Sequence, residues 1–392
     1  MRKTRLGDEA RRRAQDTLRL GVTNLRHVPI VYSKFMPATR SAQALFAPFT
    51  LKGLTLPNRI VMAPMTRSFS PGGIPTAEVA AYYRRRAEGG TGLIITEGTY
   101  LPHPLTGFDP KVPRLAEAAL PAWSNVVEQV HAAGARIFSQ LWHVGMQVTG
   151  GPPPPEGQQP QGPSMTQSEI DQVIAAYGTA AANAQAAGFD GVEIHGAHGY
   201  LLDQFFWERT NTRTDAYGGS LANRSRLATE VVAEIRSRVG PAYPIGFRFS
   251  QWKIIDYAVK LAATPAELAA FLEPLTAAGV DIFHASTRRF WDPEFEGSNL
   301  TLAAWTRKLT GRPVIAVGSV TFGADVMNTF CSDDAAPVTG IDEVLDGLER
   351  EEFDLIAIGR ALLANPDWPR LVRSGALDRL VPFTRTSLTT LL

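Results

Sequence analysis

The sequence predicts an α/β protein of the (β/α)8 barrel class, the TIM barrel. Eight short runs of aliphatic and β-branched residues recur along the 392-residue chain, and segments with hydrophobic residues at helical spacing separate them. Because the runs are apolar throughout, they are typical of strands that are buried on both faces of a parallel sheet. The eight predicted strands span residues 59–64, 91–98, 135–142, 191–196, 244–250, 281–287, 313–319 and 353–359.

The segments between these runs predict helices at 76–88, 121–133, 167–187, 223–239, 265–278 and 341–350. Several of them end in Ala-Gly or Gly-Gly, which commonly close helices. Strict alternation of strand and helix favours a parallel sheet, and eight units favour its closure into a barrel. An open, doubly wound sheet is the alternative. No Gly-x-Gly-x-x-Gly follows the first strand, which argues against a dinucleotide-binding version of that fold.

Two segments fall outside this repeat. Residues 1–42 are polar and arginine-rich and lack apolar periodicity, so we expect a flexible N-terminal extension or an over-long start with Met36 as the true initiator. A nucleic-acid-binding arm is a third interpretation. Residues 43–392 are expected to form a single barrel domain. The proline-rich stretch 150–163 follows the third strand and predicts a rim loop near the active-site mouth.

Charge and cysteine content restrict the class of partner. Lysine and arginine number 39 against 38 aspartate and glutamate, so no global field would attract nucleic acid or a membrane surface. We expect small-molecule partners instead, and no signal in the sequence sets the oligomeric state. A single cysteine, Cys331, excludes an internal disulfide and a cysteine-held iron–sulfur cluster. With no secretory signal and no apolar stretch near the roughly 18 residues of a membrane helix, a cytoplasmic location is expected.

The end of the fourth predicted strand carries two imidazoles and a phenol, on His195, His198 and Tyr200. Catalysis in such barrels takes place at the carboxyl ends of the strands. The three side chains could be structural. They could also hold a metal, with His284 or Glu97 as a third ligand. In a third interpretation, the imidazoles donate hydrogen bonds to a substrate oxygen that gains negative charge, and Tyr200 donates a proton. No metal is expected on that interpretation.

The last two predicted strands end in glycine-containing segments. Gly318 and Ser319 follow the seventh strand, and Gly359 and Arg360 follow the eighth. In barrels the loops after these two strands commonly bind phosphate through backbone N–H groups, and a guanidinium adds a charged donor. The pair of segments therefore predicts a phosphate site that could hold the tail of a mononucleotide.

Three other strand ends carry polar groups that suit a planar heterocycle. They are Pro64-Met65-Thr66 after the first strand, Gln140 in the third and Arg248 in the fifth. A hydroxyl, an amide and a guanidinium facing one cavity offer both donors and acceptors. An ion pair between Arg248 and Glu193 is the alternative for the guanidinium.

Five motifs make the chain resemble the old yellow enzyme family of FMN-dependent ene reductases. They are LPNRIVMAPMTR (56–67), GLIITEGT (92–99), QLWHVG (140–145), GFDGVEIHGAHGYLLDQFFWERTNTRTDAYGGS (188–220) and GRALLANPDW (359–368). The resemblance extends from about residue 45 to about residue 368. The segment STRRFWDPEFEGS (286–298) resembles a bacterial branch, and His198 implies membership of the group with two histidines at the substrate oxygen.

The resemblance implies a role for each matching position. The flavin ring is expected to contact Pro64, Met65, Thr66, Gly98, Gln140 and Arg248. The phosphate is expected at Gly318, Ser319, Gly359 and Arg360. His195 and His198 would bind the substrate carbonyl oxygen, Tyr200 would protonate the α-carbon, and Trp142 and Phe290 would line the substrate pocket.

The implied activity is reduction of α,β-unsaturated carbonyl compounds, with tightly bound, non-covalent FMN as cofactor and NADPH or NADH as hydride donor. A flavin-free lyase or isomerase acting on a phosphorylated metabolite could use the same phosphate site. It would lack a Schiff-base lysine, since no lysine lies in any of the eight runs. A non-catalytic flavin-binding protein is a third hypothesis.

Overall fold

A computed structural model describes residues 41–146, 162–322 and 338–392. Of the sequence predictions, Met36, Cys331, all but two residues of the N-terminal extension and most of the 150–163 loop lie outside these ranges. Residues Ser41–Leu392 form one compact unit.

Eight parallel strands close into a barrel, which confirms the predicted fold class and excludes the open sheet. Neighbours along the chain are neighbours in the barrel, and the last strand pairs with the first. Each predicted run overlaps one of the strands. They are β3 (Ile60–Met62), β4 (Leu93–Tyr100), β5 (Arg136–Trp142), β6 (Gly191–His198), β7 (Ile245–Lys253), β8 (Ile282–Ser286), β9 (Val314–Val317) and β10 (Leu355–Ile358). Of these, β4, β6 and β7 extend two or three residues beyond their predicted ends.

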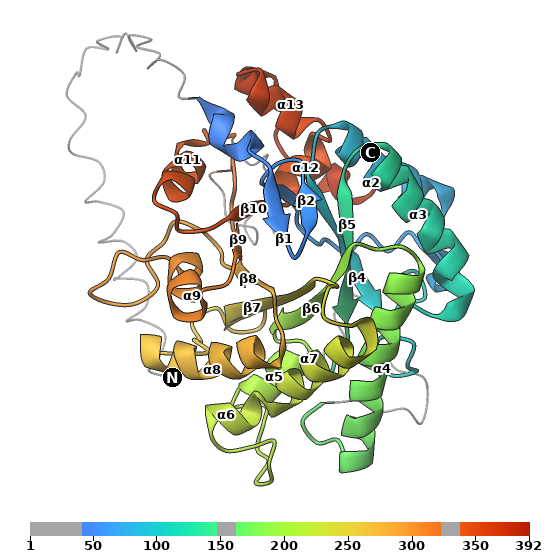
Figure 1. Cartoon of the computed structure of the whole chain (residues 1–392), viewed down its shortest axis with the longest axis vertical. Coiled ribbons are helices and arrows are strands. Elements are labelled where there is room, and N and C mark those ends of the chain that lie inside the picture. Colours follow the sequence, from blue (N-terminus) through green and yellow to red (C-terminus); the bar gives the residue numbers. More distant parts are fainter. Residues whose placement is uncertain (1–40, 147–161, 323–337) are drawn as a thin grey trace, which may run out of the picture. The chain divides into compact units, whose positions relative to one another are not determined.

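Helices surround this barrel (Figure 1). Those that the sequence predicted are α2 (Ala77–Glu88), α3 (Leu120–Ala132), α4 (Gln167–Ala186), α7 (Arg226–Val239), α8 (Pro265–Ala278) and α11 (Asp342–Glu349). Threonine side chains cap several amino ends, and at α4 Thr166 and Glu169 form a capping box. The helix predicted at 223–239 begins later, because the chain makes a separate turn, α6 (Leu221–Arg224), before Ser225.

Several shorter elements were not predicted. They are α5 (Leu201–Phe206), α9 (Leu302–Thr310), α12 (Arg360–Ala364), α13 (Trp368–Arg373), β1 (Phe49–Leu51), β2 (Leu54–Leu56) and the 3-10 turns Ala42–Phe46, Pro71–Gly73, Glu117–Ala119, Leu377–Arg379 and Arg385–Leu388. Most span six residues or fewer, too few for a periodic hydrophobic pattern to show.

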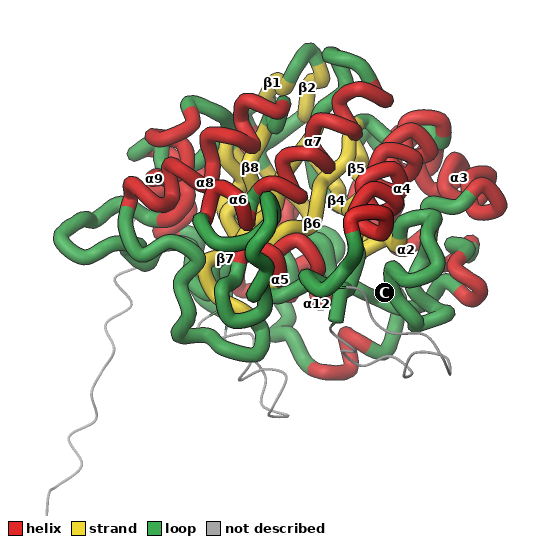
Figure 2. Tube along the Cα trace, turned by 90° about the horizontal axis from the view of Figure 1, so that it is seen from below, coloured by secondary structure: helices red, strands yellow, loops and turns green. Residues whose placement is uncertain are grey.

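The β1–β2 hairpin closes the amino end of the barrel, opposite the end that carries α5 and α12 (Figure 2). Its Leu51 and Leu56 join an apolar cluster with inward-facing barrel side chains. The other members are Val61, Ala63, Leu93, Ile95, Phe138, Ile282, Ile315, Leu355 and Ala357. The interior of this half of the barrel is therefore a packed hydrocarbon core.

Candidate active site

Polar side chains from β5, β6 and β8 fill the interior of the barrel above this core. Because side chains alternate between the two faces of a strand, Gln140 of β5, Glu193 of β6 and His284 of β8 all face inward. Gln140 Nε2 donates to Glu193 Oε1 at 2.8 Å, and the other carboxylate oxygen lies 2.7 Å from His284 Nδ1. Burial favours the neutral carboxyl, but His284 and then Arg248 outweigh it and hold the pKa of Glu193 below its usual value.

Arg248 extends from β7 toward the mouth of the barrel, and its guanidinium forms no ion pair within 4 Å with a carboxylate of the described residues. Its Nη2 donates to Ser286 Oγ at 3.2 Å, and its Nε has no hydrogen-bond partner among the described residues, although the side chain is only 7% exposed. Since both oxygens of Glu193 are engaged elsewhere, the expected alternative of an Arg248–Glu193 ion pair is not observed. The guanidinium can therefore bind an acceptor that enters the barrel mouth.

The barrel mouth opens into a cavity of about 380 Å³. Nine of the predicted site residues line it: Pro64, Met65, Thr66, His198, Arg248, Gly318, Ser319, Gly359 and Arg360. Arg248, Arg288 and Arg360 bring three guanidinium groups to this cavity, and none of its described lining residues is acidic. The electrostatics thus favour an anionic ligand.

Two glycines let the backbone approach this cavity closely. Gly318 has φ +148°, and a Cβ there would lie 2.6 Å from the carbonyl oxygen of Thr287. At Gly359 a Cβ would lie 3.3 Å from the sulfur of Met65. A side chain at Gly318 would therefore require the backbone to move, which explains why this strand end needs glycine.

The loop after β3 is fixed from below by a buried carboxylate. Glu97 Oε2 accepts from the amides of Arg67 and Ser68 at 2.7 and 3.0 Å, directly after Thr66. Burial raises the pKa of Glu97 to about 7, although these two amides and Arg67 oppose the shift. The position of Thr66 at the cavity therefore depends on a carboxyl group that titrates near neutral pH.

His195, His198 and Tyr200 lie together at the end of β6. The ring centroid of His195 lies 5.2 Å from that of His198 and 5.1 Å from that of Tyr200, and both pairs pack edge to face. His195 Nδ1 accepts from the Ala197 amide at 3.3 Å, so its proton lies on Nε2. Burial, together with the charge on Arg248, lowers the pKa of His195 well below its usual value. The ring is therefore a neutral hydrogen-bond donor at neutral pH.

Trp142 packs against two of these rings. Its centroid lies 5.0 Å from that of Tyr200 and 6.4 Å from that of His195. Gly98 gives it room, because a Cβ at that position would lie 2.5 Å from the indole. Gly98 and Gln140 do not line the cavity. Gly98 makes space for Trp142, and Gln140 lies in the polar layer beneath.

The structure does not bring Phe290 to the cavity. Its side chain is 4% exposed and packs edge to face on Trp291 and Phe353 within the hydrophobic core. The expectation that Phe290 lines a substrate pocket is corrected here: an aromatic side chain in a rim loop gains more by burial beneath the loop than by exposure at the mouth.

Other cavity residues were not predicted from the sequence. Ser286 ends β8, and its Oγ lies 2.8 Å from His198 Nε2. Its place at a predicted strand end is the same signal that selected the other candidates. Trp252 stacks on His198 with centroids 4.5 Å apart, and it shares the lining with Thr287 and Arg288. Trp252 and Arg288 lie past the predicted strand ends, where no periodicity places them.

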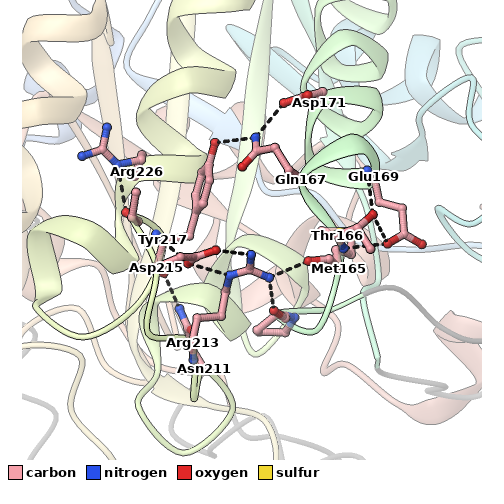
Figure 3. Close-up of polar contacts among 12 residues, drawn as sticks. Met165, Thr166, Gln167, Glu169, Asp171, Asn211, Arg213, Asp215, Tyr217 and Arg226 are labelled. Carbon is pink, nitrogen blue, oxygen red and sulfur yellow. Dashed lines mark hydrogen bonds and ion pairs between the residues drawn. The ribbon is translucent and has the colours of Figure 1, made fainter.

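The longest motif also contains residues that serve the scaffold. Arg213 donates to the carbonyl oxygens of Pro163 and Met165, at 2.7 and 2.5 Å, and forms an ion pair with Asp215 (Figure 3). Tyr217 accepts a hydrogen bond from Gln167 of α4 at 3.2 Å. These contacts attach the loop after α5 to the start of α4, away from the cavity.

A lysine lies in the barrel after all. The prediction that none would was wrong, because β7 continues three residues beyond its predicted end, to Lys253. Its Nζ is 2.5 Å from Asp203 Oδ1, and Lys253 does not line the cavity. Nor does any trio of histidine, cysteine or acidic side chains within the described ranges have the arrangement of a metal site. Neither the Schiff-base nor the metal interpretation gains support.

None of the helices in the described ranges is long and apolar enough to cross a lipid bilayer.

Comparison with known proteins shows relatives over most of the chain. The family model of the NADH:flavin oxidoreductase / NADH oxidase family matches residues 44–378. An NADH oxidase of Thermoanaerobacter brockii is 35% identical over 86% of the chain, which spans about half (52%) of that longer protein. A 12-oxophytodienoate reductase 1 of rice, Oryza sativa subsp. japonica, is 34% identical, over 87% of the chain and 89% of the relative.

The fold has solved counterparts. The structure of an old yellow enzyme homologue from Zymomonas mobilis superimposes with a TM-score of 0.71 and 27% sequence identity, covering 88% of this chain and 96% of that one.

Proposed function

Since the chain belongs to the NADH:flavin oxidoreductase / NADH oxidase family, and is an NAD(P)H-dependent flavin enzyme of the old yellow enzyme type with FMN as cofactor, we propose that it reduces the carbon–carbon double bond of α,β-unsaturated carbonyl compounds. The observation that carries this proposal is the grouping of His195, His198 and Tyr200 beside a cavity with three guanidinium groups. Two hydrogen-bond donors and a phenol in one place suit an oxygen that gains charge next to a carbon that needs a proton.

The cavity residues fit FMN. Arg248 presents a buried, unpartnered Nε to the cavity, and Thr66 adds a hydroxyl. Gly318, Ser319, Gly359 and Arg360 would hold the phosphate, where glycine allows close approach and the guanidinium supplies charge. When bound, FMN supplies two-electron chemistry, accepting hydride from NAD(P)H and passing it to the β-carbon of the alkene.

The two histidines would bind the carbonyl oxygen of the substrate. His195 is neutral and has its proton on Nε2, so at neutral pH it offers one hydrogen-bond donor, at Nε2. His198 lies at φ +64°, an uncommon conformation that turns the chain at the end of β6. As the oxygen gains negative charge, donors already in place stabilise it without reorganising, and loss of one would cost on the order of 10²-fold in rate.

Tyr200 would complete the reaction by protonating the α-carbon. Its ring is positioned edge to face against both Trp142 and His195. A phenol is a suitable acid because it stays protonated at neutral pH yet can be replenished from solvent.

The first test is the visible spectrum of the purified protein. Bands of oxidised flavin that bleach with NAD(P)H and return with 2-cyclohexenone would support cofactor and activity together. A protein that stays colourless after incubation with FMN would contradict the flavin assignment. A protein that bleaches with NAD(P)H but is not reoxidised by any enone under anaerobic conditions would contradict the proposed substrate class alone.

The role of Tyr200 gives a specific prediction. Tyr200→Phe should slow enone reduction by at least about 10²-fold, the usual contribution of a positioned general acid, while flavin reduction by NAD(P)H stays within about twofold. Stopped-flow absorbance separates the two half-reactions. Tyr177→Phe removes the hydroxyl of a fully buried tyrosine of α4 and should change neither rate. An unchanged enone rate in Tyr200→Phe would show that another group donates the proton.

A further inference from the structure

A buried ion pair supports the turn that carries His198 and Tyr200. Lys253 Nζ and Asp203 Oδ1 are 2.5 Å apart, and neither side chain has any exposed surface. The other lysine–carboxylate pairs of the described residues, Lys52–Asp281 and Lys260–Glu294, each have a lysine that is at least one-third exposed. The Lys253–Asp203 pair does not line the cavity and takes no part in the proposed chemistry.

Both partners of this pair contact the turn. Asp203 Oδ2 accepts from the Gly199 amide at 2.6 Å, between His198 and Tyr200. Lys253 ends β7 directly beside His198, its partner in the sheet register. Gln204, which follows Asp203 in α5, donates to the Gly199 carbonyl at 2.8 Å. Both polar atoms of the Gly199 backbone are thus held by side chains of α5.

The turn needs such support because its backbone is unusual. His198 and Gly199 have φ values of +64° and +82°, and the sheet register shifts between Gly196 and His198. A side chain such as histidine adopts positive φ only where the surroundings impose it.

Stability alone is a weak reason for this pair. Removing an ammonium and a carboxylate from water costs about as much as their attraction returns, so apolar side chains of similar size would often serve the fold equally well. A charged pair adds a fixed geometry. When a lysine holds one oxygen of the carboxylate, the other oxygen can accept from an amide in only one orientation.

We propose that Lys253 and Asp203 are positioning residues that hold the His198–Gly199–Tyr200 turn in the geometry required to protonate the substrate. This inference rests on the proposed function, because it assigns Tyr200 the role of proton donor. Neither residue touches the substrate: Asp203 acts through the Gly199 amide, and Lys253 acts by fixing the carboxylate of Asp203.

The test separates proton delivery from electron transfer. FMN-loaded enzyme is reduced anaerobically with dithionite, and its reoxidation is followed with 2-cyclohexenone, which needs a proton at carbon, or with ferricyanide, which needs none. Lys253→Met and Asp203→Asn should slow reoxidation by cyclohexenone at least tenfold. The rate of reoxidation by ferricyanide should stay within about twofold of the wild-type rate. The solvent isotope effect on the cyclohexenone reaction should rise, because proton transfer then limits the rate.

A variant of another ion pair serves as a control. Arg236 and Asp281 are also largely buried and lie 2.6 Å apart, but Asp281 precedes β8 at the amino end of the barrel. Arg236→Met should leave the ratio of the two reoxidation rates unchanged. Should Lys253→Met not fold, the double variant Asp203→Asn/Lys253→Met, which leaves no uncompensated charge, takes its place with the same expected loss.

The possible outcomes differ clearly. Cyclohexenone rates within twofold of wild type, or equal losses with both oxidants, would overturn the positioning role. Wild-type enzyme that ferricyanide reoxidises and cyclohexenone does not would instead contradict the proposed function.

Discussion

At the scale of single residues, the environment of each ionisable group sets its chemistry. His195 and Glu97 are both buried within the barrel, yet burial has opposite effects on them. It removes the positive charge of the imidazole at neutral pH, and it moves the carboxyl pKa up toward neutrality. The first effect creates a neutral donor, and the second makes the support of the Thr66 loop sensitive to pH.

The neutral state of His195 predicts a flat pH dependence for substrate binding. Its pKa lies well below 6.5 in the fold, so its protonation state should not change between pH 6 and 8. The KM for 2-cyclohexenone, measured across that range, should therefore show no inflection from this ring. An inflection near pH 6.5 that disappears in His195→Asn would contradict the neutral assignment.

Glu97 makes a prediction for stability. Its folded pKa of about 7 lies above the unfolded value of 4.5, so the folded state binds the extra proton between these values. The stability it contributes is present below pH 4.5 and is lost as pH rises through 7. The unfolding free energy of wild type minus that of Glu97→Gln should fall by about 1 kcal/mol from pH 6 to pH 8.

Urea denaturation of both proteins without flavin measures this difference. The pH-dependent contributions of the buried histidines to the unfolding free energy cancel, because both proteins contain them. A difference that stays constant from pH 6 to 8 would mean that Glu97 keeps an ordinary pKa.

At the scale of elements, the carboxyl ends of the strands combine irregular backbone with chemistry. Gly318 lies just after β9 and Gly359 just after β10, while His198 and Lys253 extend their strands beyond the regular ladder. An edge of the barrel can depart from ideal geometry here because the apolar core and the β1–β2 hairpin stabilise the other end.

The segments after β9 and β10 predict recognition of phosphate. Arg360→Leu should weaken FMN binding at least tenfold and leave riboflavin binding within about twofold, because riboflavin lacks the phosphate that the guanidinium would bind. Fluorescence quenching of either flavin on titration with apoprotein gives both affinities. Arg370→Leu of α13, which changes an exposed arginine outside the cavity, is the control. Equal losses for both flavins would place the phosphate elsewhere.

At the scale of the whole molecule, one ligand would connect strand ends that are far apart in the sequence. The cavity takes residues from the ends of β3, β6, β7, β8, β9 and β10. A ligand that contacts all of these strand ends binds the folded barrel and not the unfolded chain. At a free concentration of 100 times its Kd, such a ligand would stabilise the fold by about 2.7 kcal/mol. FMN should therefore raise the Tm of the apoprotein by several degrees, as followed by circular dichroism. A Tm that does not depend on FMN concentration would exclude binding across these strand ends.

The sequence by itself determined the barrel and nearly half of the residues that line the cavity. All eight strands follow from continuous apolar runs, because a strand buried on both faces leaves a local, readable pattern. Nine predicted residues line the cavity for the same reason: parallel strands in a barrel end at one rim, so the residues that follow them meet there.

Only the tertiary structure decided which side chains touch. The Lys253–Asp203 pair, the contact of Ser286 with His198 and the packing of Phe290 on Phe353 join residues about 50 to 90 positions apart. Such contacts depend on strand register, on where each strand ends and on which loop side chains fold inward. These are properties of the closed barrel, where neighbouring strands set each other's positions, and no local periodicity in the chain encodes them.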